Sequence, residues 1–274
     1  MIPPVSRTRA SSSPRRGSAA RCRVRIACIR SKRRGLPTGS EILEHEPGDL
    51  TCIVESGLRL SELRAALAQH GQRFSLDPPG NPTLGECLLD NLSGPLSHRF
   101  GTMRDLVIGV TVVLPDGTRA SSGGKVVKNV AGYDLGKLFC GSRGRLGSVE
   151  RLALRLHPLP AAARTVVTEM PWSELHRTQL VPSAADLVRG RLHLLFEGSE
   201  RAVAEQCAWA GGDPAEPWAE IRELQATLPG RVRWDGEDAP LVRPGPRLAY
   251  VEEMCDPKWS PLAERVAEAL CSRS

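Results

Sequence analysis

The chain has 274 residues, of which 41% are hydrophobic, so it is large enough for one two-part domain or for two domains. Its net charge of +6 originates in residues 1–40, which hold eleven of the 37 basic side chains and no acidic one; the remaining residues hold 26 basic and 31 acidic side chains, a balance of −5. No aromatic residue lies among those arginines, which argues against a base-stacking nucleic-acid platform.

Residues 1–40 are rich in Arg and Ser and cannot bury a hydrophobic core. Three interpretations fit this composition. The segment could be an organelle transit peptide, a disordered basic arm, or sequence produced by a wrong start site or reading frame. A basic arm would attract phosphates or anionic lipid without sequence specificity.

Regular elements are expected after Glu41, the first acidic residue. Leu50–Glu55 (LTCIVE) is short, apolar and rich in β-branched residues, and Ser-Gly follows it, which predicts a strand. Leucines and alanines then recur at helical spacing over residues 60–71. We expect Ser61 to cap the start of this helix and Gly71 to end it.

A β-hairpin and a further strand are expected in the middle of the chain. Asp105–Leu114 (DLVIGVTVVL) has the clearest strand pattern, and Arg119–Ser121 is expected to return antiparallel to it. Pro115–Thr118 between them has the residue types of a turn. Val149–Leu156 alternates apolar and polar residues, as a half-buried strand does.

The pattern changes after Pro160. Arg191–Glu197 predicts a strand, and Ser199–Ala210 predicts a helix with Ser199 as its N-cap. Trp218–Leu228 predicts another helix. Gly, Pro and Asp then dominate until a last helix expected at Ser260–Leu270.

The densest functional signal is the glycine-rich segment of residues 122–147 (SGGKVVKNVAGYDLGKLFCGSRGRLG). Glycine permits positive φ and close backbone approach, which a loop around a planar cofactor and its phosphates requires. Asp134 is expected to N-cap a short helix, Leu135–Cys140, that ends at Gly141. A glycine-rich surface loop with one capped helix is an equally good interpretation of the spacing alone.

Another candidate loop, which we call the first loop because it precedes the glycine-rich one (the second loop), covers residues 76–105 (LDPPGNPTLGECLLDNLSGPLSHRFGTMRD). Small and polar residues there come shortly before Arg99 and Arg104. Such a loop offers a ligand backbone donors, hydroxyl groups and one or two cations. By themselves, the two arginines are more simply explained as solvated surface charges.

The eight cysteines are scattered along the chain and form no Cys-x-x-Cys pair. This spacing is typical of reduced thiols in a cytosolic protein and not of a disulfide framework, a zinc site or an iron–sulfur site. No metal site is therefore expected. The longest uncharged apolar stretch, Leu106–Leu114, is far too short to span a membrane.

Three runs of residues together resemble the FAD domain of the vanillyl-alcohol-oxidase-type flavoproteins: LEHEPGDLTCIVESGLRLSELRAALAQHGQRFSLDPPG, then TLGE with NLSGPLSHRFGTMRDLVIGVTVVLPDGT, then SGGKVVKNVAGYDLGKLFCGSRGRLGSVERLALRLHPLP. Within that superfamily, GGKVVKNVAGYDLGKLF resembles the glycolate oxidase subunits. The direct passage from LEHEPGDLT to LDPPG is more similar to the smaller, E-type subunit than to the D-type subunit. The resemblance is strong over residues 43–160, weak over about 190–225, and absent elsewhere.

The resemblance implies an α+β fold. It consists of a PCMH-type FAD-binding domain with two α/β subdomains, the N-terminal one incomplete, followed by a small α+β cap-like region. The expected boundaries are a basic leader at 1–40, the partial FAD-binding domain at 41–160 and the cap-like region at 161–274.

The resemblance also implies the residues that contact FAD, most of them through the backbone. In the first loop these are Pro79, Gly80, Thr83, Gly85, Asn91, Ser93 and Gly94. In a basic turn they are Arg99, Gly101 and Asp105. In the second loop they are Gly124, Asn129, Gly132, Tyr133, Asp134, Gly141, Ser142, Gly144, Leu146 and Gly147.

The chain departs from the family pattern upstream of Leu43. The family places a glycine-rich pyrophosphate loop of the type RGGGT there, and residues 33–39 (RRGLPTG) lack its consecutive glycines. This favours truncation or a frame change as the origin of residues 1–40. Glu86 stands where a second glycine is usual, and the family's C-terminal FNPG-type segment has no counterpart.

The implied function is that of an FAD-binding subunit of a glycolate (2-hydroxy acid) dehydrogenase complex, an oxidoreductase acting on CH–OH groups. The implied partners are a D-type flavin subunit and an iron–sulfur subunit that receives the electrons. The implied location is cytoplasmic, with peripheral association at the inner membrane as an option. No catalytic residue can be assigned, since His98 and Tyr133 lie in suggestive loops but fit structural roles.

Two other functions compete with this one. A truncated or degenerate flavoprotein homologue would be inactive and at most an interaction module. A polyanion-binding protein would act through residues 1–40 and bind in a strongly salt-dependent way.

Overall fold

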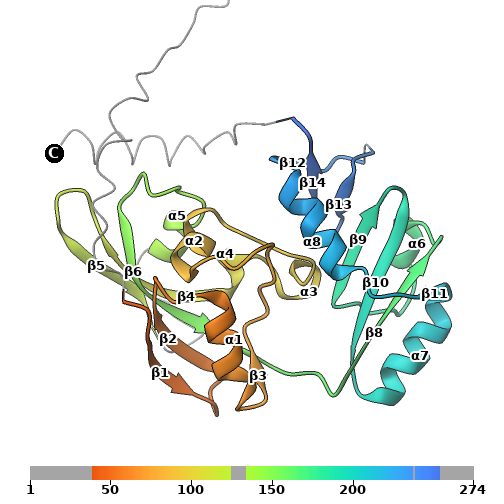
Figure 1. The fold of residues 1–274 in the computed structure, drawn as a ribbon, viewed down its shortest axis with the longest axis horizontal. Helices are drawn as coiled ribbons and strands as arrows, with labels where there is room; N and C mark the ends of the chain where they lie inside the picture. The colour runs from red at the N-terminus through yellow and green to blue at the C-terminus, as the bar shows by residue number, and fades with distance from the viewer. Residues whose placement is uncertain (1–38, 125–133, 237, 254–274) are drawn as a thin grey trace, which may run out of the picture. The chain divides into compact units, whose positions relative to one another are not determined.

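Two antiparallel sheets organise the chain, one formed by residues before Pro160 and the other by residues after it (Figure 1). The computed structural model describes residues 39–124, 134–236 and 238–253, which lie within one compact unit, Leu36–Ser274. The sheets and the short helices beside them give the α+β architecture expected from the sequence.

The first sheet has five strands in the order β1-β2-β6-β4-β5. They are β1 (Ile42–Glu46), β2 (Thr51–Glu55), β4 (Val107–Val113), β5 (Arg119–Gly123) and β6 (Ser148–Arg155). All but β1 were predicted to within two residues at either end. The side chains of β1 are half-buried or exposed, so its sequence shows no buried apolar face by which it could be recognised.

Four helices contribute buried residues to the hydrophobic core of this sheet: α1 (Leu60–Ala68), α2 (Leu84–Leu89), α4 (Met103–Leu106) and α5 (Leu135–Phe139). In α1 the buried leucines are Leu60, Leu63 and Leu67, the spacing of one helical face. They share one cluster with Val54 and Leu154 of the sheet. Burial of each such side chain contributes about 1.5–3 kcal/mol.

The predicted N-cap of α1 is wrong. Ser61 lies inside the first turn, and its backbone N–H donates to Asn81 Oδ1 at 3.0 Å. The N-cap is Arg59, two residues earlier than predicted, and Glu62 accepts from its backbone N–H at 3.2 Å. Asn81 and Glu62 therefore accept from backbone N–H groups at the start of the helix, the role predicted for the Ser61 hydroxyl. Gly71, with φ of +66°, follows the helix as expected.

Residues 76–105 are not a continuous loop, because α2, α3 (Ser97–Phe100) and α4 (Met103–Leu106) lie in or overlap this segment. The predicted start of the strand at Asp105 is also wrong, since that residue belongs to α4. Its carboxylate accepts from the backbone N–H of Thr102 at 2.8 Å and so fixes a helical turn before β4 begins.

The predicted hairpin is confirmed. Strand β4 pairs antiparallel with β5, and the turn between them places Gly117 at φ +86°. Asp116 Oδ1 accepts from the backbone N–H of Thr118 at 2.8 Å, the local bond for which aspartate is favoured in turns.

The second sheet has seven strands in the order β11-β8-β10-β9-β13-β14-β12. They are β8 (Ala162–Thr168), β9 (Ala184–Val188), β10 (Arg191–Gly198), β11 (Asp213–Pro214), β12 (Gly230–Arg233), β13 (Leu241–Arg243) and β14 (Leu248–Val251). Only β10 was predicted. A separate two-stranded sheet pairs β3 (Gln72–Arg73) with β7 (His157–Pro158).

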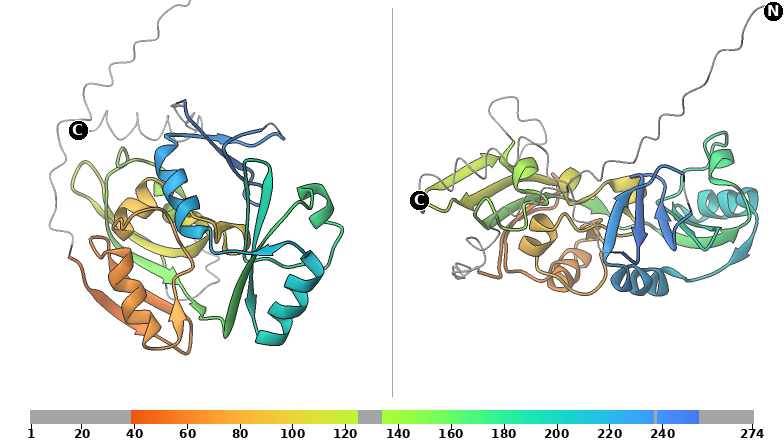
Figure 2. Two further views of the ribbon diagram at one scale, coloured as in Figure 1. Left: turned by 45° about the vertical axis from the view of Figure 1, so that its right-hand side comes forward. Right: turned by 90° about the horizontal axis from the view of Figure 1, so that it is seen from above.

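Three helices accompany the second sheet: α6 (Trp172–Leu175), α7 (Glu200–Ala210) and α8 (Trp218–Thr227). Both longer helices were predicted, and Ser199 caps α7 by accepting from the backbone N–H of Ala202 at 3.3 Å. Helix α7, cyan in Figure 2, packs against β8 and β10. The helix predicted at Ser260–Leu270 lies outside the described residues.

Candidate functional site

The structure places the two glycine-rich segments next to each other at the C-terminal end of α2. The backbone N–H of Gly141 donates to the carbonyl of Leu88 at 3.0 Å, and that of Arg143 donates to the carbonyl of Leu89 at 2.8 Å. Carbonyls at a helix C-terminus have no partner within the helix, so these bonds satisfy them. Two segments that the sequence predicts to enclose one ligand are therefore joined directly.

Most of the predicted contact residues of the second loop fall within the described chain. Asp134 caps α5 by accepting from the backbone N–H of Lys137 at 3.0 Å, as predicted. Leu146 is a core residue. A Cβ at Gly147 would overlap the carbonyl oxygen of Val113, so glycine is required for packing there. Asn129, Gly132 and Tyr133 lie outside the described residues.

The other small residues of the second loop leave space for a ligand. A Cβ at Gly124 or at Gly144 would meet nothing within 4 Å. The hydroxyl of Ser142 is buried and has no hydrogen-bond partner among the described residues. An orphaned buried hydroxyl beside open backbone is a feature that a bound polar ligand would complete.

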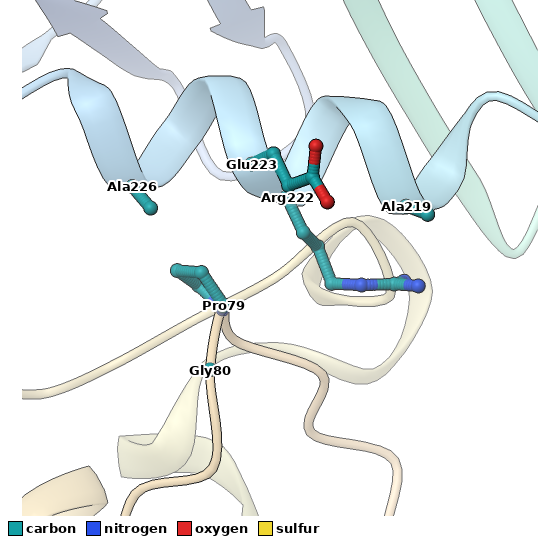
Figure 3. A pocket seen from close by; sticks show the side chains of 6 residues that line it. All are labelled: Pro79, Gly80, Ala219, Arg222, Glu223 and Ala226. Atoms are coloured by element: carbon teal, nitrogen blue, oxygen red, sulfur yellow. The ribbon is translucent and has the colours of Figure 1, made fainter.

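A pocket of about 240 Å³ adjoins the first loop (Figure 3). Pro79 and Gly80 form its floor, and α8 provides the opposite wall, with Arg222 extending from the helix toward the loop. Gly80 has φ of +71°, a conformation that favours glycine. The pocket is smaller than the 300–1,000 Å³ typical of drug-sized ligand sites, so it could hold only part of a dinucleotide.

Thr83 and Gly85 have clear structural roles at the start of α2. Thr83 Oγ1 accepts from the backbone N–H of Glu86 at 3.2 Å, while the Glu86 carboxylate accepts from the backbone N–H of Thr83 at 2.8 Å. This capping box turns Glu86 back onto its own helix, where a carboxylate is favourable. Gly85 donates its backbone N–H to the carbonyl of Ser56 at 2.8 Å and packs closely against that residue.

Asn91, Ser93 and Gly94 are fixed by contacts within the protein. Asn91 has φ of +46°, and its Oδ1 accepts from the thiol of Cys140 at 3.1 Å. A Cβ at Gly94 would overlap the backbone carbonyl of Asp77, so only glycine fits. Ser93 is buried and belongs to a polar network that the sequence did not predict.

This network centres on Arg243, whose side chain is fully buried. Its guanidinium donates to Asp186 Oδ2 at 3.2 Å, to the hydroxyl of Tyr250 at 2.7 Å and to Gln225 Oε1 at 2.8 Å. Gln225 Nε2 in turn donates to the carbonyl of Ser93 at 2.9 Å, and the hydroxyls of Ser93 and Tyr250 lie 3.3 Å apart. The second sheet thereby holds the first loop in place.

Asp77, at the start of the first loop, is an acid whose pKa is strongly perturbed. Burial raises its pKa to about 7, although Arg243, the Leu96 backbone N–H, Arg222 and Arg64 all favour its charged form. Its Oδ1 accepts from the N–H of Leu96 at 3.0 Å. A buried carboxyl of this kind retains its proton at pH values where an exposed aspartate is ionised.

The Asp77→Asn variant is expected to remove a pH dependence of stability. The folded protein holds the Asp77 proton up to about pH 7, whereas the unfolded chain releases it near pH 4. The folded state therefore binds more protons between these values, and the free energy of unfolding of the wild type falls as pH rises through this window.

Chemical denaturation at pH 4.5 and pH 7.5 measures this effect. Between these pH values the free energy of unfolding of the wild type should fall by more than about 1 kcal/mol relative to that of Asp77→Asn, since each pKa unit corresponds to about 1.4 kcal/mol. Asparagine can still accept from Leu96, and every other titrating group is common to both proteins. Parallel pH profiles of the two proteins would contradict the assignment.

The basic turn has mixed roles. Arg99 donates to Ser183 Oγ at 3.3 Å, so it contacts the segment preceding β9 and is not simply solvated. Gly101 has φ of +81° and ends α3, while Asp105 is occupied as a cap of α4. Arg104 donates to the carbonyl of Lys137 at 3.2 Å. Contacts within the protein are therefore sufficient to explain the positions of these residues, and no bound ligand is needed.

Within residues 39–124, 134–236 and 238–253, no group of three or more His, Cys, Asp or Glu side chains is positioned to hold a metal ion. In the same part of the chain, no helix combines the length and the apolar character needed to cross a bilayer.

Comparison with known proteins finds similarity to FAD-dependent proteins. The sequence pattern of the FAD binding domain family matches residues 36–123. The glycolate oxidase subunit GlcE of Escherichia coli is 31% identical over 226 residues, which cover 76% of this chain and 64% of that protein. The mitochondrial cytochrome-type D-lactate dehydrogenase of Arabidopsis thaliana is 39% identical over 156 residues, covering 57% of this chain and 28% of that protein.

The fold is also similar to that of a solved structure. A solved structure of alkyldihydroxyacetonephosphate synthase superposes with a TM-score of 0.53 at 18% identity, over 67% of this chain and 43% of that one. The chain covers less than two thirds of the length of each of these proteins. Residues 36–123 therefore match an FAD binding domain, and the chain is similar, over part of their length, to glycolate oxidase subunits and D-lactate dehydrogenases.

Proposed function

We propose that the chain is an FAD-binding subunit of a complex that oxidises a 2-hydroxy acid. The observation that carries this proposal is the junction of the two loops at α2, where the unpartnered hydroxyl of Ser142 lies beside open backbone at Gly144. Ser142 would donate to a polar group of the cofactor. Gly144 and Gly124 would admit its close approach to the backbone. When bound, FAD supplies the two-electron redox chemistry.

The substrate class is proposed from the relatives. They include the glycolate oxidase subunits GlcE and GlcD and several D-lactate dehydrogenases, and both names refer to small 2-hydroxy acids. Their shared chemistry is oxidation of a secondary or primary alcohol beside a carboxylate. We propose a D-type flavin subunit and an iron–sulfur subunit as partners, and a cytoplasmic complex that can associate with the inner membrane peripherally.

The remaining predicted contact residues stay part of this proposal. Asn91, Ser93 and Gly94 would shape the first loop through their backbone, because their side-chain positions are already fixed by protein contacts. Pro79, Gly80 and Arg222 would border the part of the ligand that enters the pocket at α8. Arg222 could offset negative charge there.

The Ser142→Ala variant separates ligand binding from folding. Loss of one hydrogen bond is expected to weaken FAD binding about 3- to 10-fold, since a typical bond contributes about 0.5–1.5 kcal/mol. Stability of the ligand-free protein should not fall, because the hydroxyl has no partner to lose. Titration of the purified protein with FAD, followed by flavin fluorescence, measures the affinity.

Ser75→Ala is the matched control. Its hydroxyl is also buried and unpartnered, but it lies outside both predicted loops. It should bind FAD as the wild type does. If the wild type neither releases flavin on denaturation nor binds added FAD, the proposal is overturned, and the chain is a flavoprotein homologue that has lost its cofactor.

A further inference from the structure

A second pocket, of about 380 Å³, is lined by His98 of the first loop and otherwise by residues outside both loops. We call it the aromatic pocket, and the side chains that define it are His98, Trp172, His176, Trp234 and Arg247. His98 comes from α3, Trp172 and His176 come from α6 and the residue after it, and Trp234 and Arg247 come from the segments that flank β13 and β14. None of these residues was predicted to contact flavin.

Ring edges and faces dominate its walls. Trp172 forms T-shaped contacts with His98, at 5.8 Å between ring centroids, and with His176, at 4.4 Å. The indole of Trp234 adds a second large aromatic surface to the lining. Aromatic side chains arranged at right angles favour a planar ring that can stack on one and meet the edge of another.

His98 supplies a polar group that the protein leaves unsatisfied. Its Nδ1 atom is buried and has no hydrogen-bond partner among the described residues. Burial, with a smaller contribution from His176, lowers the pKa of His98, so the imidazole is neutral at pH 7 and able to accept as well as donate. Gly245 permits the close approach of the backbone to this ring, since a Cβ there would overlap Nδ1.

Arg247 gives the pocket its charge preference. Its side chain is exposed and forms no ion pair within the described part of the chain. No acidic side chain lines the pocket. A planar guanidinium without a carboxylate partner matches a carboxylate in charge and in geometry. A cationic ligand would meet this charge unfavourably.

We propose that the aromatic pocket binds an aromatic carboxylate of one or two rings, with the ring against Trp172 and Trp234 and the carboxylate paired with Arg247. A short aliphatic acid would leave the indole surfaces uncovered, and a neutral aromatic ligand would leave Arg247 unpaired. The pocket is within the size range of small-molecule sites. The proposal does not depend on flavin binding.

Calorimetric titration of the full chain with benzoate tests the proposal. Acetate and benzyl alcohol serve as the charge-only and ring-only probes. Benzoate should bind saturably at millimolar concentration or below, and more tightly than either. Arg247→Gln should weaken benzoate binding about tenfold or more, because a charge-assisted bond is lost. Arg247→Lys, which keeps the positive charge, should bind benzoate more tightly than Arg247→Gln does.

Trp172→Phe should reduce the quenching of tryptophan fluorescence by benzoate. Trp209→Phe, which alters a 60% exposed indole on α7 outside the pocket, should leave that quenching unchanged. Absence of saturable benzoate binding to the wild type overturns the proposal, as does equal affinity for acetate, and both results are obtained even if a variant fails to fold. Equal benzoate affinity of folded Arg247→Gln would overturn the role of the charge.

Discussion

Arg243→Met is expected to lower the free energy of unfolding by about 3–5 kcal/mol, the cost of breaking a fully buried ion pair. Arg243 and Asp186 are both completely inaccessible to solvent, and Asp186 Oδ1 already lacks a partner. Removal of the guanidinium would leave the carboxylate, the Gln225 amide oxygen and the Tyr250 hydroxyl without their shared donor. Guanidinium denaturation followed by circular dichroism measures the loss.

The double variant Arg243→Met/Asp186→Leu distinguishes the buried charge from packing. It removes both ions and should recover much of the stability, because a hydrophobic pair of similar volume avoids the desolvation cost. Arg201→Met provides the surface control. Arg201 pairs with Glu205 in an exposed i,i+4 contact at 2.8 Å, and loss of such a pair changes stability little. An Arg243→Met effect as small as that of Arg201→Met would contradict the prediction.

Gly94→Ala is expected to have the second-largest effect and to lower the free energy of unfolding by about 2 kcal/mol or more. A methyl group at this position would overlap the backbone carbonyl of Asp77, which cannot move as a flexible side chain could. The segment from Ser93 to Leu96 would have to shift and weaken the bonds that Ser93 makes with Gln225 and Tyr250. Thermal unfolding and FAD titration should both show the loss.

Gly48→Ala is the matched control for Gly94→Ala. A Cβ at Gly48 would meet nothing within 4 Å, and its φ lies outside the left-handed region, so the substitution should leave stability unchanged or slightly higher. Wild-type stability and FAD affinity in Gly94→Ala would show that the loop at Asp77 can relax, and the proposed rigidity of the first loop would then be wrong.

Hydrogen bonds between residues a few positions apart in the sequence were predictable. Asp134 and Ser199 were predicted as N-caps because each accepts from a backbone N–H three residues ahead. Helix α2 was missed although Thr83-x-x-Glu86 is the signature of a capping box. The surrounding prolines and glycines favoured a loop interpretation, and that signature could have corrected it.

Long-range contacts were not predictable from one sequence. Arg243 lies in a three-residue strand, β13, within a segment that Pro, Gly and Asp dominate. Nothing near it indicates that its partners are Asp186, Gln225 and Tyr250. Strands of three or four residues carry too little periodicity to be recognised, and they form here because neighbours in the sheet supply their hydrogen bonds.

In the candidate site, too, local features were predicted and long-range contacts were not. Glycine density indicated the second loop, because backbone conformation constrains the residue type directly. The first loop was proposed from its small and polar residues and the two arginines that follow them. The polar residues that position the first loop were missed, and Asp77 and Arg222 are examples. Their significance follows from burial beside the second sheet, a property of the assembled fold.

The bonds from Gln225 and Tyr250 to Ser93, and from Arg231 to the carbonyl of Asn91, have a thermodynamic consequence. A ligand that displaces the first loop must break contacts that hold the second sheet against it. Occupancy of the loop and docking of that sheet are therefore linked equilibria, and each shifts the other by the same factor. If the first loop contacts FAD as proposed, a partner that pulls on β14 would change FAD affinity without touching the cofactor.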